Sequence, residues 1–346
     1  MPDSEPNRAR WTQPIVLGPN QPLERAYRGG AGIARFRGTP QPSEFTPEDF
    51  VGSTTEVYAG GGVGLTLLPN GRLLRDEVQS DPVAFLGEEH VRRFGASLEL
   101  LVKLLHTAER LFVHFHPDAD FSRAHLNRDR GKTEAWVIVD TDGDGYAHLG
   151  FSRDVSDVEL ERWVTHQDVP DMLGAMNRVA VRPGDTLFVP ARMPHSIGPG
   201  ILLVELQEPT DVSVLLEFAD FGITLDAALF GLDPGTALAG LDSRAWQAEQ
   251  MNQLVAHDAR TDEAVEPLFG RQADDVFRAD RYRPRGTVGL DAGFSILVVL
   301  NGTGTLSFEE GSIDLARGMT LLVPFAVAGA RLIGDVEVIR CRPPRG

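Results

Sequence analysis

The sequence contains very little cysteine and no long apolar stretch. One of its 346 residues is a cysteine, Cys341, so no disulfide bond can form within the chain, which fits a reducing compartment. No run approaches the roughly 18 apolar residues of a membrane-spanning helix. The N-terminal stretch also lacks the apolar core of a signal peptide. We therefore expect a cytoplasmic protein that does not enter a membrane.

Positive charge is scarce as well. Only 33 Lys and Arg residues stand against 50 Asp and Glu residues, which gives a formal net charge of -17. Such a surface repels nucleic-acid phosphates and anionic lipids, so neither is an expected partner. We expect a small-molecule partner, and an anionic one would need a local cluster of cations. The oligomeric state is left open between a monomer and a homodimer.

Short apolar runs, separated by many of the 36 glycines and 23 prolines, dominate the chain. Runs of four to eight residues that are rich in Val, Leu, Phe and Thr are typical of strands, and many at close spacing favour a sandwich or barrel. Helical patterns occupy residues 81–106, 155–177 and 227–259. The sequence predicts a mainly β protein with helical insertions.

Two segments, 177–209 and 304–344, follow the same pattern of polar strand, glycine turn, apolar strand ending in proline, and last strand. This pattern predicts an internal duplication, and so two β-barrels of one type. The expected domains are a metal-binding catalytic barrel over 1–220 with a helical insertion around 153–177, a helical connector over 221–262, and a degenerate barrel over 263–346. The last region contains no histidine, so we expect it to be metal-free.

Three histidines and a glutamate form a candidate metal site. His114 and His116 flank Phe115 in an apolar strand, where residues two apart share a face. Glu134 precedes another strand, and His195 follows a third. Three imidazoles and one carboxylate can hold a divalent metal and leave positions open for substrate. The alternative is that these histidines lie near strands only by chance.

The motifs around these residues resemble a known family. VRPGDTLFVPARMPHSI, residues 181–197, is similar to the second cupin motif, although cupins usually have glycine in place of Arg192. The long HPD-to-GKTE insertion between His116 and Glu134, the segment NRVAVRPGD, the HSIGPG turn and LLVELQEPTD resemble type I mannose-6-phosphate isomerase. The similarity extends from about Gly52 through Asp211 and more weakly to the C-terminus.

This resemblance implies a bicupin fold and a metal-dependent enzyme that interconverts mannose 6-phosphate and fructose 6-phosphate through an enediol. It implies one divalent metal, zinc first, on His114, His116, Glu134 and His195, where the family has a Gln in place of His114. The family's active-site lysines correspond to Lys103 and Lys132. Lys132, two residues from Glu134, is a candidate proton-transfer group.

One departure concerns the substrate. The family has an arginine in the pocket about four residues after the Asp that corresponds to Asp211, and here Val214 or Leu215 takes that place. Arg192 is the candidate to replace it. The positively charged residues that lie near the site along the sequence are Lys103, Arg123, Arg128, Arg130, Lys132 and Arg192. The alternatives are an isomerase of an unphosphorylated sugar, a cupin dioxygenase with iron, and a non-catalytic sugar-binding cupin.

Overall fold

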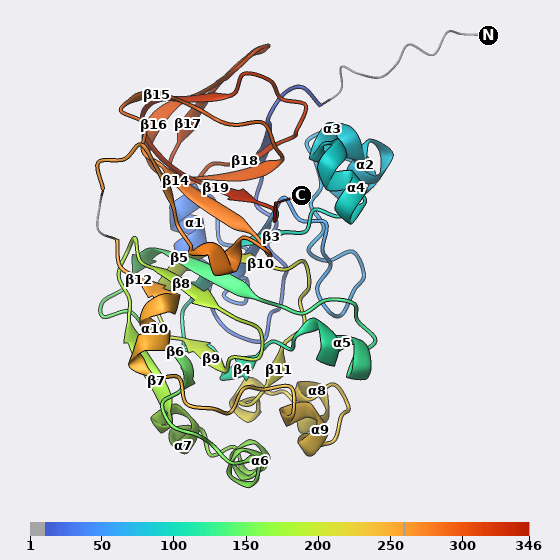
Figure 1. Cartoon of the computed structure of the whole chain (residues 1–346), viewed down its shortest axis with the longest axis vertical. Helices are drawn as coiled ribbons and strands as arrows, with labels where there is room; N and C mark the ends of the chain where they lie inside the picture. Colours follow the sequence, from blue (N-terminus) through green and yellow to red (C-terminus); the bar gives the residue numbers. More distant parts are fainter. Residues whose placement is uncertain (1–10, 259–260, 346) are drawn as a thin grey trace, which may run out of the picture.

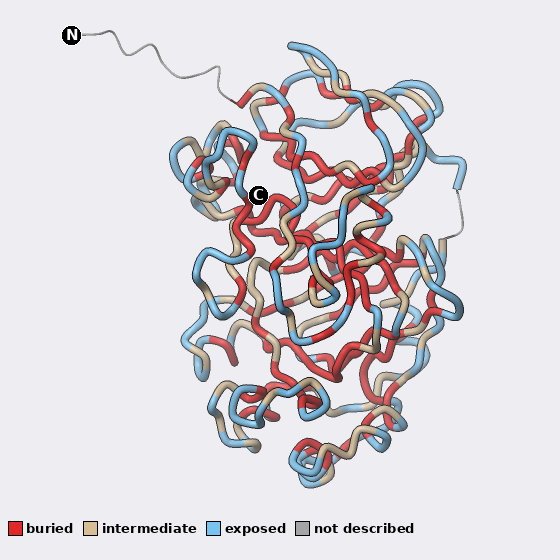
Figure 2. The backbone as a smooth tube through the Cα atoms, turned by 180° about the vertical axis from the view of Figure 1, so that it is seen from behind, coloured by how far each residue is buried: buried red, intermediate tan, exposed pale blue. Residues whose placement is uncertain are grey.

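A computed structural model of the chain describes residues 11–258 and 261–345. Residues 1–10, which the sequence predicts not to form a signal peptide, lie outside the described residues. The fold is mainly β, as predicted, with three sheets stacked along the long axis of the molecule and short helices around them (Figure 1). Buried backbone follows the sheets through the middle of the molecule, and exposed backbone lies at its edges (Figure 2).

The central layer is a six-stranded antiparallel sheet with the order β12-β8-β5-β10-β3-β2. Its strands are β2 (Glu48–Val51), β3 (Leu101–Thr107), β5 (Glu134–Thr141), β8 (Thr186–Val189), β10 (Ile201–Gln207) and β12 (Val255–Ala256). Strand β10 is buried at all seven positions. A strand covered on both faces reads as a continuous apolar run, which explains the sequence ILLVELQ.

A five-stranded sheet with the order β11-β4-β9-β6-β7 covers one face of the central sheet. Its strands are β4 (His114–Phe115), β6 (Tyr146–Phe151), β7 (Met176–Ala180), β9 (His195–Ile197) and β11 (Val214–Leu215). Side chains of both sheets, such as Trp136 and Leu203 on one and Leu149 and Ile197 on the other, share one hydrophobic core. The candidate metal residues therefore lie between these two sheets.

An eight-stranded sheet packs on the opposite face of the central sheet. Its strands are β1 (Ile15–Leu17), β13 (Val265–Pro267), β14 (Arg278–Tyr282), β15 (Gly286–Gly289), β16 (Ser295–Phe308), β17 (Gly311–Ala316), β18 (Thr320–Val323) and β19 (Arg331–Arg342). Ala135 and Val204 of the central sheet contact the same core as Ile296 and Ile339. Strand β1 pairs with β18, so the N-terminal segment contributes an edge strand to the C-terminal sheet.

The helices are short and lie at the periphery. They are α1 (Ala31–Arg37), α2 (Leu74–Ser80), α3 (Pro82–Leu86), α4 (Glu88–Phe94), α5 (Ala119–His125), α6 (Asp157–His166), α7 (Val169–Gly174), α8 (Leu225–Ala228), α9 (Pro234–Leu238) and α10 (Ala248–Leu254), with 3-10 turns at Ala219–Phe221 and Arg271–Ala273. The predicted helical stretch around 155–177 forms as α6 and α7. The Ser156 side chain accepts a hydrogen bond from the Glu159 backbone N–H and so caps α6.

The prediction of one helix over 81–106 is wrong in its second half. Helix α4 ends at Phe94, Gly95 follows with φ 67°, and residues 101–107 form strand β3 in the centre of a sheet. All seven residues of β3 are buried. Because both faces of this strand pack, its sequence LVKLLHT lacks the alternation of a half-exposed strand. Lys103 therefore lies in a strand and not on an amphipathic helix.

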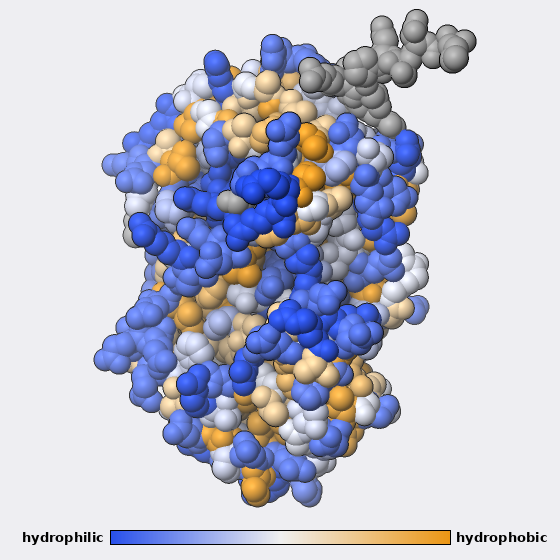
Figure 3. Space-filling view, turned by 45° about the vertical axis from the view of Figure 1, so that its right-hand side comes forward, coloured by the Kyte–Doolittle hydropathy of each residue, from blue (hydrophilic) through white to orange (hydrophobic). Residues whose placement is uncertain are grey.

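Two other segments form helices and strands differently from the sequence prediction. The helical pattern over 227–259 breaks into α8, α9 and α10, and GLTLLP (64–69) forms only an isolated bridge through Leu67. None of the helices in the described part of the chain has the length and apolar character to cross a bilayer. The face in Figure 3 is largely hydrophilic, with apolar side chains in smaller groups.

The core of the C-terminal sheet gives a first testable prediction. Leu321 is fully buried and lies opposite Leu297 and Val16. Leu321→Ala should lower the free energy of unfolding by about 2–5 kcal/mol through the cavity that it leaves. The same change at Leu23, which is 63% exposed, should alter it by at most about 0.5 kcal/mol. Denaturant unfolding measures both. Equal effects of the two substitutions would contradict the assigned core.

Candidate metal centre and its pocket

Three buried histidines converge between the central and the five-stranded sheets. His114 in β4 lies directly opposite His195 in β9, and His116 follows two residues later on the same face, as predicted. The ring centroid of His114 is 4.1 Å from that of His195 and 4.9 Å from that of His116. One ring nitrogen of each lies within 4.8 Å of the others. Among the described residues, this is the one group of at least three such ligands that could hold a metal ion.

Backbone carbonyls fix which nitrogen of each ring carries the proton. Nδ1 of His114 lies 3.0 Å from the Phe112 carbonyl, Nδ1 of His195 lies 2.9 Å from that of Met193, and Nδ1 of His116 lies 2.9 Å from that of Val212. A carbonyl oxygen can only accept, so each Nδ1 must donate its hydrogen. The Nε2 lone pairs are thereby left for the centre of the cluster, the arrangement found in metal-binding histidines.

Burial keeps two of these rings, those of His114 and His116, neutral. It lowers the pKa of His114 well below its ordinary value, and the neighbouring His195 adds to this effect. Burial and the Lys132 ammonium together lower the pKa of His116 to about 3. Neutral imidazole is the form that binds a metal, so the rings need not lose protons to accept one.

Glu134, the first residue of β5, completes the group of ligand atoms. Its Oε2 lies 3.0 Å from His116 Nε2 and its Oε1 lies 3.3 Å from His195 Nε2. The indole N–H of Trp136 donates to Oε1 at 3.0 Å and orients the carboxylate. Within the described part of the chain, His195 Nε2 has no hydrogen-bond partner although it is buried. Lone pairs that face each other in this way do not bond, but they can bind one cation together, so the residues present fit a divalent metal.

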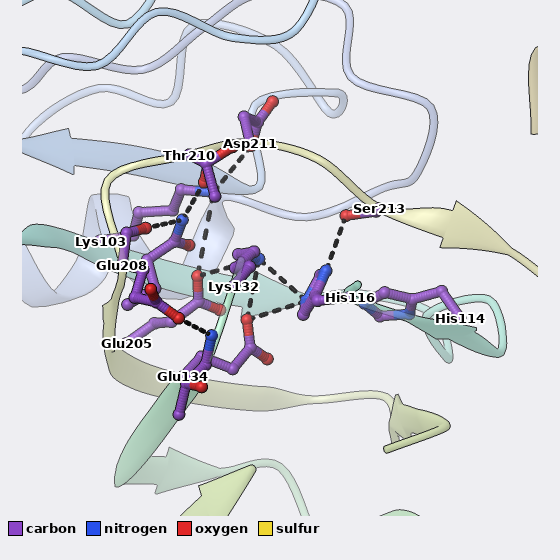
Figure 4. Close-up of polar contacts among 12 residues, drawn as sticks. Lys103, His114, His116, Lys132, Glu134, Glu205, Glu208, Thr210, Asp211 and Ser213 are labelled. Carbon is purple, nitrogen blue, oxygen red and sulfur yellow. Dashed lines mark hydrogen bonds and ion pairs between the residues drawn. The ribbon is translucent and has the colours of Figure 1, made fainter. Parts of the chain in front are cut away.

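The two lysines of the chain both line this pocket (Figure 4). Lys132 Nζ lies 2.8 Å from Glu134 Oε2 and 2.9 Å from His116 Nε2. Burial alone would raise the pKa of Glu134, but the Lys132 ammonium and His116 hold it well below its usual value. The structure thus brings Lys132 next to the four predicted ligands.

Lys103 lies in a network of buried charged side chains. Its Nζ lies 3.1 Å from Asp211 Oδ1, 3.2 Å from Glu48 Oε1 and 3.8 Å from Glu205 Oε1. Burial by itself would lower the pKa of Lys103, but these three carboxylates raise it well above its ordinary value. Arg25 adds a second cation to Asp211, at 3.2 Å. Lys103 therefore stays charged and acts as a fixed positive centre.

Glu205 is the carboxylate that the sequence reasoning did not assign. It lies in β10 between Lys103 and Trp136, in register with both, and it is buried. Burial and the nearby Glu134 raise its pKa to about 7, and the two lysines pull in the opposite direction. The signal that could have found it is a charged residue inside the apolar run ILLVELQ. The other unassigned titratable residues of the pocket are Arg25, Tyr27, Glu48 and Asp211.

Arg192, the third residue predicted to be catalytic, does not join the pocket. It is exposed, with φ 73°, the left-handed conformation that explains why cupins usually have glycine there. Its guanidinium donates to the carbonyls of Ala239 and Gly240 at 3.3 and 3.1 Å, beside the end of α9. Leu215 stands in β11 directly opposite His114. The place of the family's arginine is thus filled by an apolar residue, and Arg192 does not replace it.

The buried charges give a second prediction. Lys103→Met should lower the free energy of unfolding by about 3–5 kcal/mol, because it leaves buried carboxylates without their cation. In the variant the folded-state pKa of Glu205 rises further above its unfolded value. The stability that its protonated form contributes is present at low pH and lost as the pH rises through the folded pKa. The loss relative to wild type should therefore grow between about pH 5 and pH 8.

Denaturant unfolding of chelator-treated protein at both pH values measures this effect. Adding Glu205→Gln to Lys103→Met should recover part of the lost stability, because the neutral amide needs no cation. A loss that is equal at both pH values and unchanged in the double variant would show that the network does not couple these residues.

Comparison with known proteins relates the chain to one group of enzymes. Residues 29–135 match the family model of the phosphomannose isomerase type I catalytic domain. The chain is 29% identical to a mannose-6-phosphate isomerase of Bacillus subtilis over 334 residues, which cover 95% of this chain and 98% of that protein.

Solved structures support the same fold. The crystal structure of the mannose 6-phosphate isomerase from Bacillus subtilis superposes with a TM-score of 0.75 at 21% identity, over 95% of this chain and 99% of that one. A mannose 6-phosphate isomerase bound with zinc and yttrium superposes with a TM-score of 0.74 at 15% identity, over 96% and 100% of the two chains. The resemblance predicted from the motifs is confirmed, because the chain is similar in sequence and in fold to type I phosphomannose isomerases.

Proposed function

We propose that the protein is a metal-dependent isomerase that interconverts mannose 6-phosphate and fructose 6-phosphate through an enediol. One observation carries the proposal. Three imidazoles and a carboxylate converge beside both lysines of the chain, in a single pocket. The similarity to a mannose-6-phosphate isomerase over nearly the whole chain supplies the reaction and the substrate.

His114, His116, His195 and Glu134 would hold the metal. Three nitrogen donors and one oxygen donor suit zinc, and a structural neighbour contains zinc. When bound, such an ion polarises the sugar carbonyl and stabilises the negative charge that develops on the enediol oxygens. The remaining chemistry belongs to the protein side chains around it.

Two side chains are placed to move the proton between C1 and C2. Lys132 Nζ is next to Glu134 and His116, and Glu205 Oε1 lies 4.0 Å from Lys132 Nζ. Glu205, with its pKa raised to about 7, can take up and release a proton near neutral pH, as a shuttle requires. Lys103, held charged by its carboxylates, supplies a fixed positive charge and no base. Arg192 takes no part in this scheme, because its side chain bonds to the end of α9.

A second candidate is an isomerase of an unphosphorylated sugar. The observation that favours it is Leu215, an apolar side chain where the resemblance places an arginine. Such a protein would keep the metal residues and both lysines, since these serve the reacting end of the sugar. Comparison of phosphorylated and free sugars as substrates separates the two candidates.

The architecture that fits this function is a pair of cupin-type barrels. The first, over residues 1–220, would contain the catalytic site, and the second, over 263–346, would be a metal-free copy joined to it by the connector 221–262, of which residues 259–260 lie outside the described residues. The order β7, β8 and β10, with the short strand β9 added before β10, resembles the order β17, β18 and β19 and supports the duplication. The monomeric or dimeric state and the cytoplasmic location remain predictions from the sequence.

The metal gives a third prediction. The purified protein should contain about one divalent ion per chain, and His195→Ala should lose most of it because the remaining ligands bind the ion less tightly. His166→Ala is the matched control, since His166 is exposed on α6 and its ring bonds to the Arg162 carbonyl. Elemental analysis measures both. A full metal content in His195→Ala would show that the ligand set is wrong.

The fourth prediction tests the reaction. The wild type should interconvert mannose 6-phosphate and fructose 6-phosphate with a higher kcat/KM than it shows for free mannose. Lys132→Ala should keep the metal and lose roughly 10²–10⁴-fold in kcat, the usual contribution of a general acid or base. Glu205→Gln, compared under the same conditions, shows which of the two groups moves the proton. Activity of Lys132→Ala within about threefold of wild type would assign Lys132 a structural role, because a proton-transfer group contributes far more.

A further inference from the structure

Every cation in the lining of the pocket is paired with a carboxylate, so none is left for a phosphate group. Three cations and four carboxylates line it, namely Arg25, Lys103, Lys132, Glu48, Glu134, Glu205 and Asp211. Each of these cations lies within ion-pair distance of at least one of these carboxylates. A sugar phosphate carries nearly two negative charges at neutral pH. Its phosphate, at C6, lies at the far end of the sugar from the reacting carbons C1 and C2. It therefore needs a cation outside this lining.

Five of the six cations near the site in sequence are already engaged. Lys103 and Lys132 bind the pocket carboxylates, Arg123 binds Asp120, Arg130 binds both oxygens of Glu99, and Arg192 binds the carbonyls at the end of α9. The guanidinium of Arg128 has a contact with the Tyr58 ring but no hydrogen bond or ion pair to any residue in the described part of the chain, and Arg128 is exposed. It is the cation of this group that remains free for a ligand.

Arg128 contacts an aromatic ring whose backbone is bonded to a pocket residue. Its guanidinium carbon lies 5.5 Å from the centroid of the Tyr58 ring. The Tyr58 backbone N–H in turn reaches Oδ2 of Asp211, a pocket residue, at 3.4 Å. The Tyr58 ring is 49% exposed and meets Phe230 at 4.7 Å between centroids. Three segments that are distant in sequence therefore meet at Tyr58.

The backbone around Arg128 is anchored on both sides. The Arg128 N–H donates to the Ser122 carbonyl at the end of α5, and the Lys132 N–H donates to the Pro117 carbonyl. On the other wall, Val57 is buried against Phe50 and Leu101 and precedes Tyr58 directly. Arg128 is four residues from Lys132 in the sequence. Its backbone belongs to the anchored loop, and its side chain contacts the Tyr58 ring. A planar guanidinium that stacks on an aromatic face keeps its N–H edge free for bidentate bonds to phosphate.

We propose that Arg128, stacked on Tyr58 at the mouth of the pocket, binds the phosphate group of the substrate. It would take over the role of the family's arginine, whose place Leu215 occupies. Tyr58 is a positioning residue that holds the guanidinium toward the opening. The inference rests on the proposed function, since it assigns the phosphate end of that substrate.

Steady-state kinetics of the metal-loaded enzyme test the proposal. Arg128→Ala should raise KM for mannose 6-phosphate by roughly 10–100-fold, the factor that a charge-assisted hydrogen bond of this kind supplies. The turnover number kcat should stay within about threefold, because the lost contact serves ground state and transition state alike. Inorganic phosphate, used as a competitive inhibitor, should bind the variant more weakly by a similar factor. Any residual turnover of free mannose should not change.

Matched variants separate specific contact from net charge. Arg35→Ala removes an exposed arginine that pairs with Asp142, so it changes the net charge equally and should leave KM near wild type. Tyr58→Phe keeps the ring and should also stay near wild type. Tyr58→Ala should raise KM, because the guanidinium loses its support.

The outcomes distinguish this proposal from the proposed function. If wild type converts mannose 6-phosphate and Arg128→Ala has the KM of Arg35→Ala, the phosphate role of Arg128 is rejected while the function stands. If wild type binds inorganic phosphate through Arg128 but does not convert mannose 6-phosphate, the anion site stands and the substrate is rejected. If Tyr58→Phe is as impaired as Tyr58→Ala, the stacking role of the ring is rejected.

Discussion

The convergence of three histidine ring nitrogens and a carboxylate on one buried point is the constraint on which the rest of the pocket depends. Backbone carbonyls of Phe112, Val212 and Met193 hold the Nδ1 protons, so the lone pairs of His114, His116 and His195 point inward. Lone pairs that face one another in a dry interior are costly unless a cation lies among them. The backbone hydrogen bonds around these strands therefore favour a bound metal ion, whether or not a substrate is present.

The central sheet, which supports this point, is buried on both faces. This burial explains the unusual pairing of charged residues in its strands. One face of β3, β5 and β10 packs toward the C-terminal sheet with mainly apolar side chains, while the other carries Lys103, Glu134 and Glu205 among apolar neighbours. A charge in such a place is stable only when it is paired. The pairing of Lys103 with carboxylates keeps it ionised, and the crowding of carboxylates lets Glu205 hold a proton near neutral pH. Stability and reactivity here come from the same contacts.

The sequence places the candidate metal residues near one another because their signal is local. His114 and His116 alternate along a strand, and the motif around His195 has fixed spacing. The helix proposed over Lys103 is wrong because a strand buried on both faces has no alternation to read. The sequence does not identify Glu205, Arg25 and Asp211 as residues of one pocket. They come together only through the register of three strands and the positions of two loops. Arg192 is adjacent to the motif in sequence, yet its backbone at φ 73° and the end of α9 take its side chain elsewhere.

The central claim is that one divalent ion binds among His114, His116, His195 and Glu134. Anomalous diffraction from crystals of the zinc-loaded protein, recorded on both sides of the zinc edge, tests it most directly. The account predicts one strong peak within bonding distance of the three Nε2 atoms and of a Glu134 oxygen. A principal peak elsewhere in the chain, or no peak at these residues in protein that contains zinc by elemental analysis, would contradict the account.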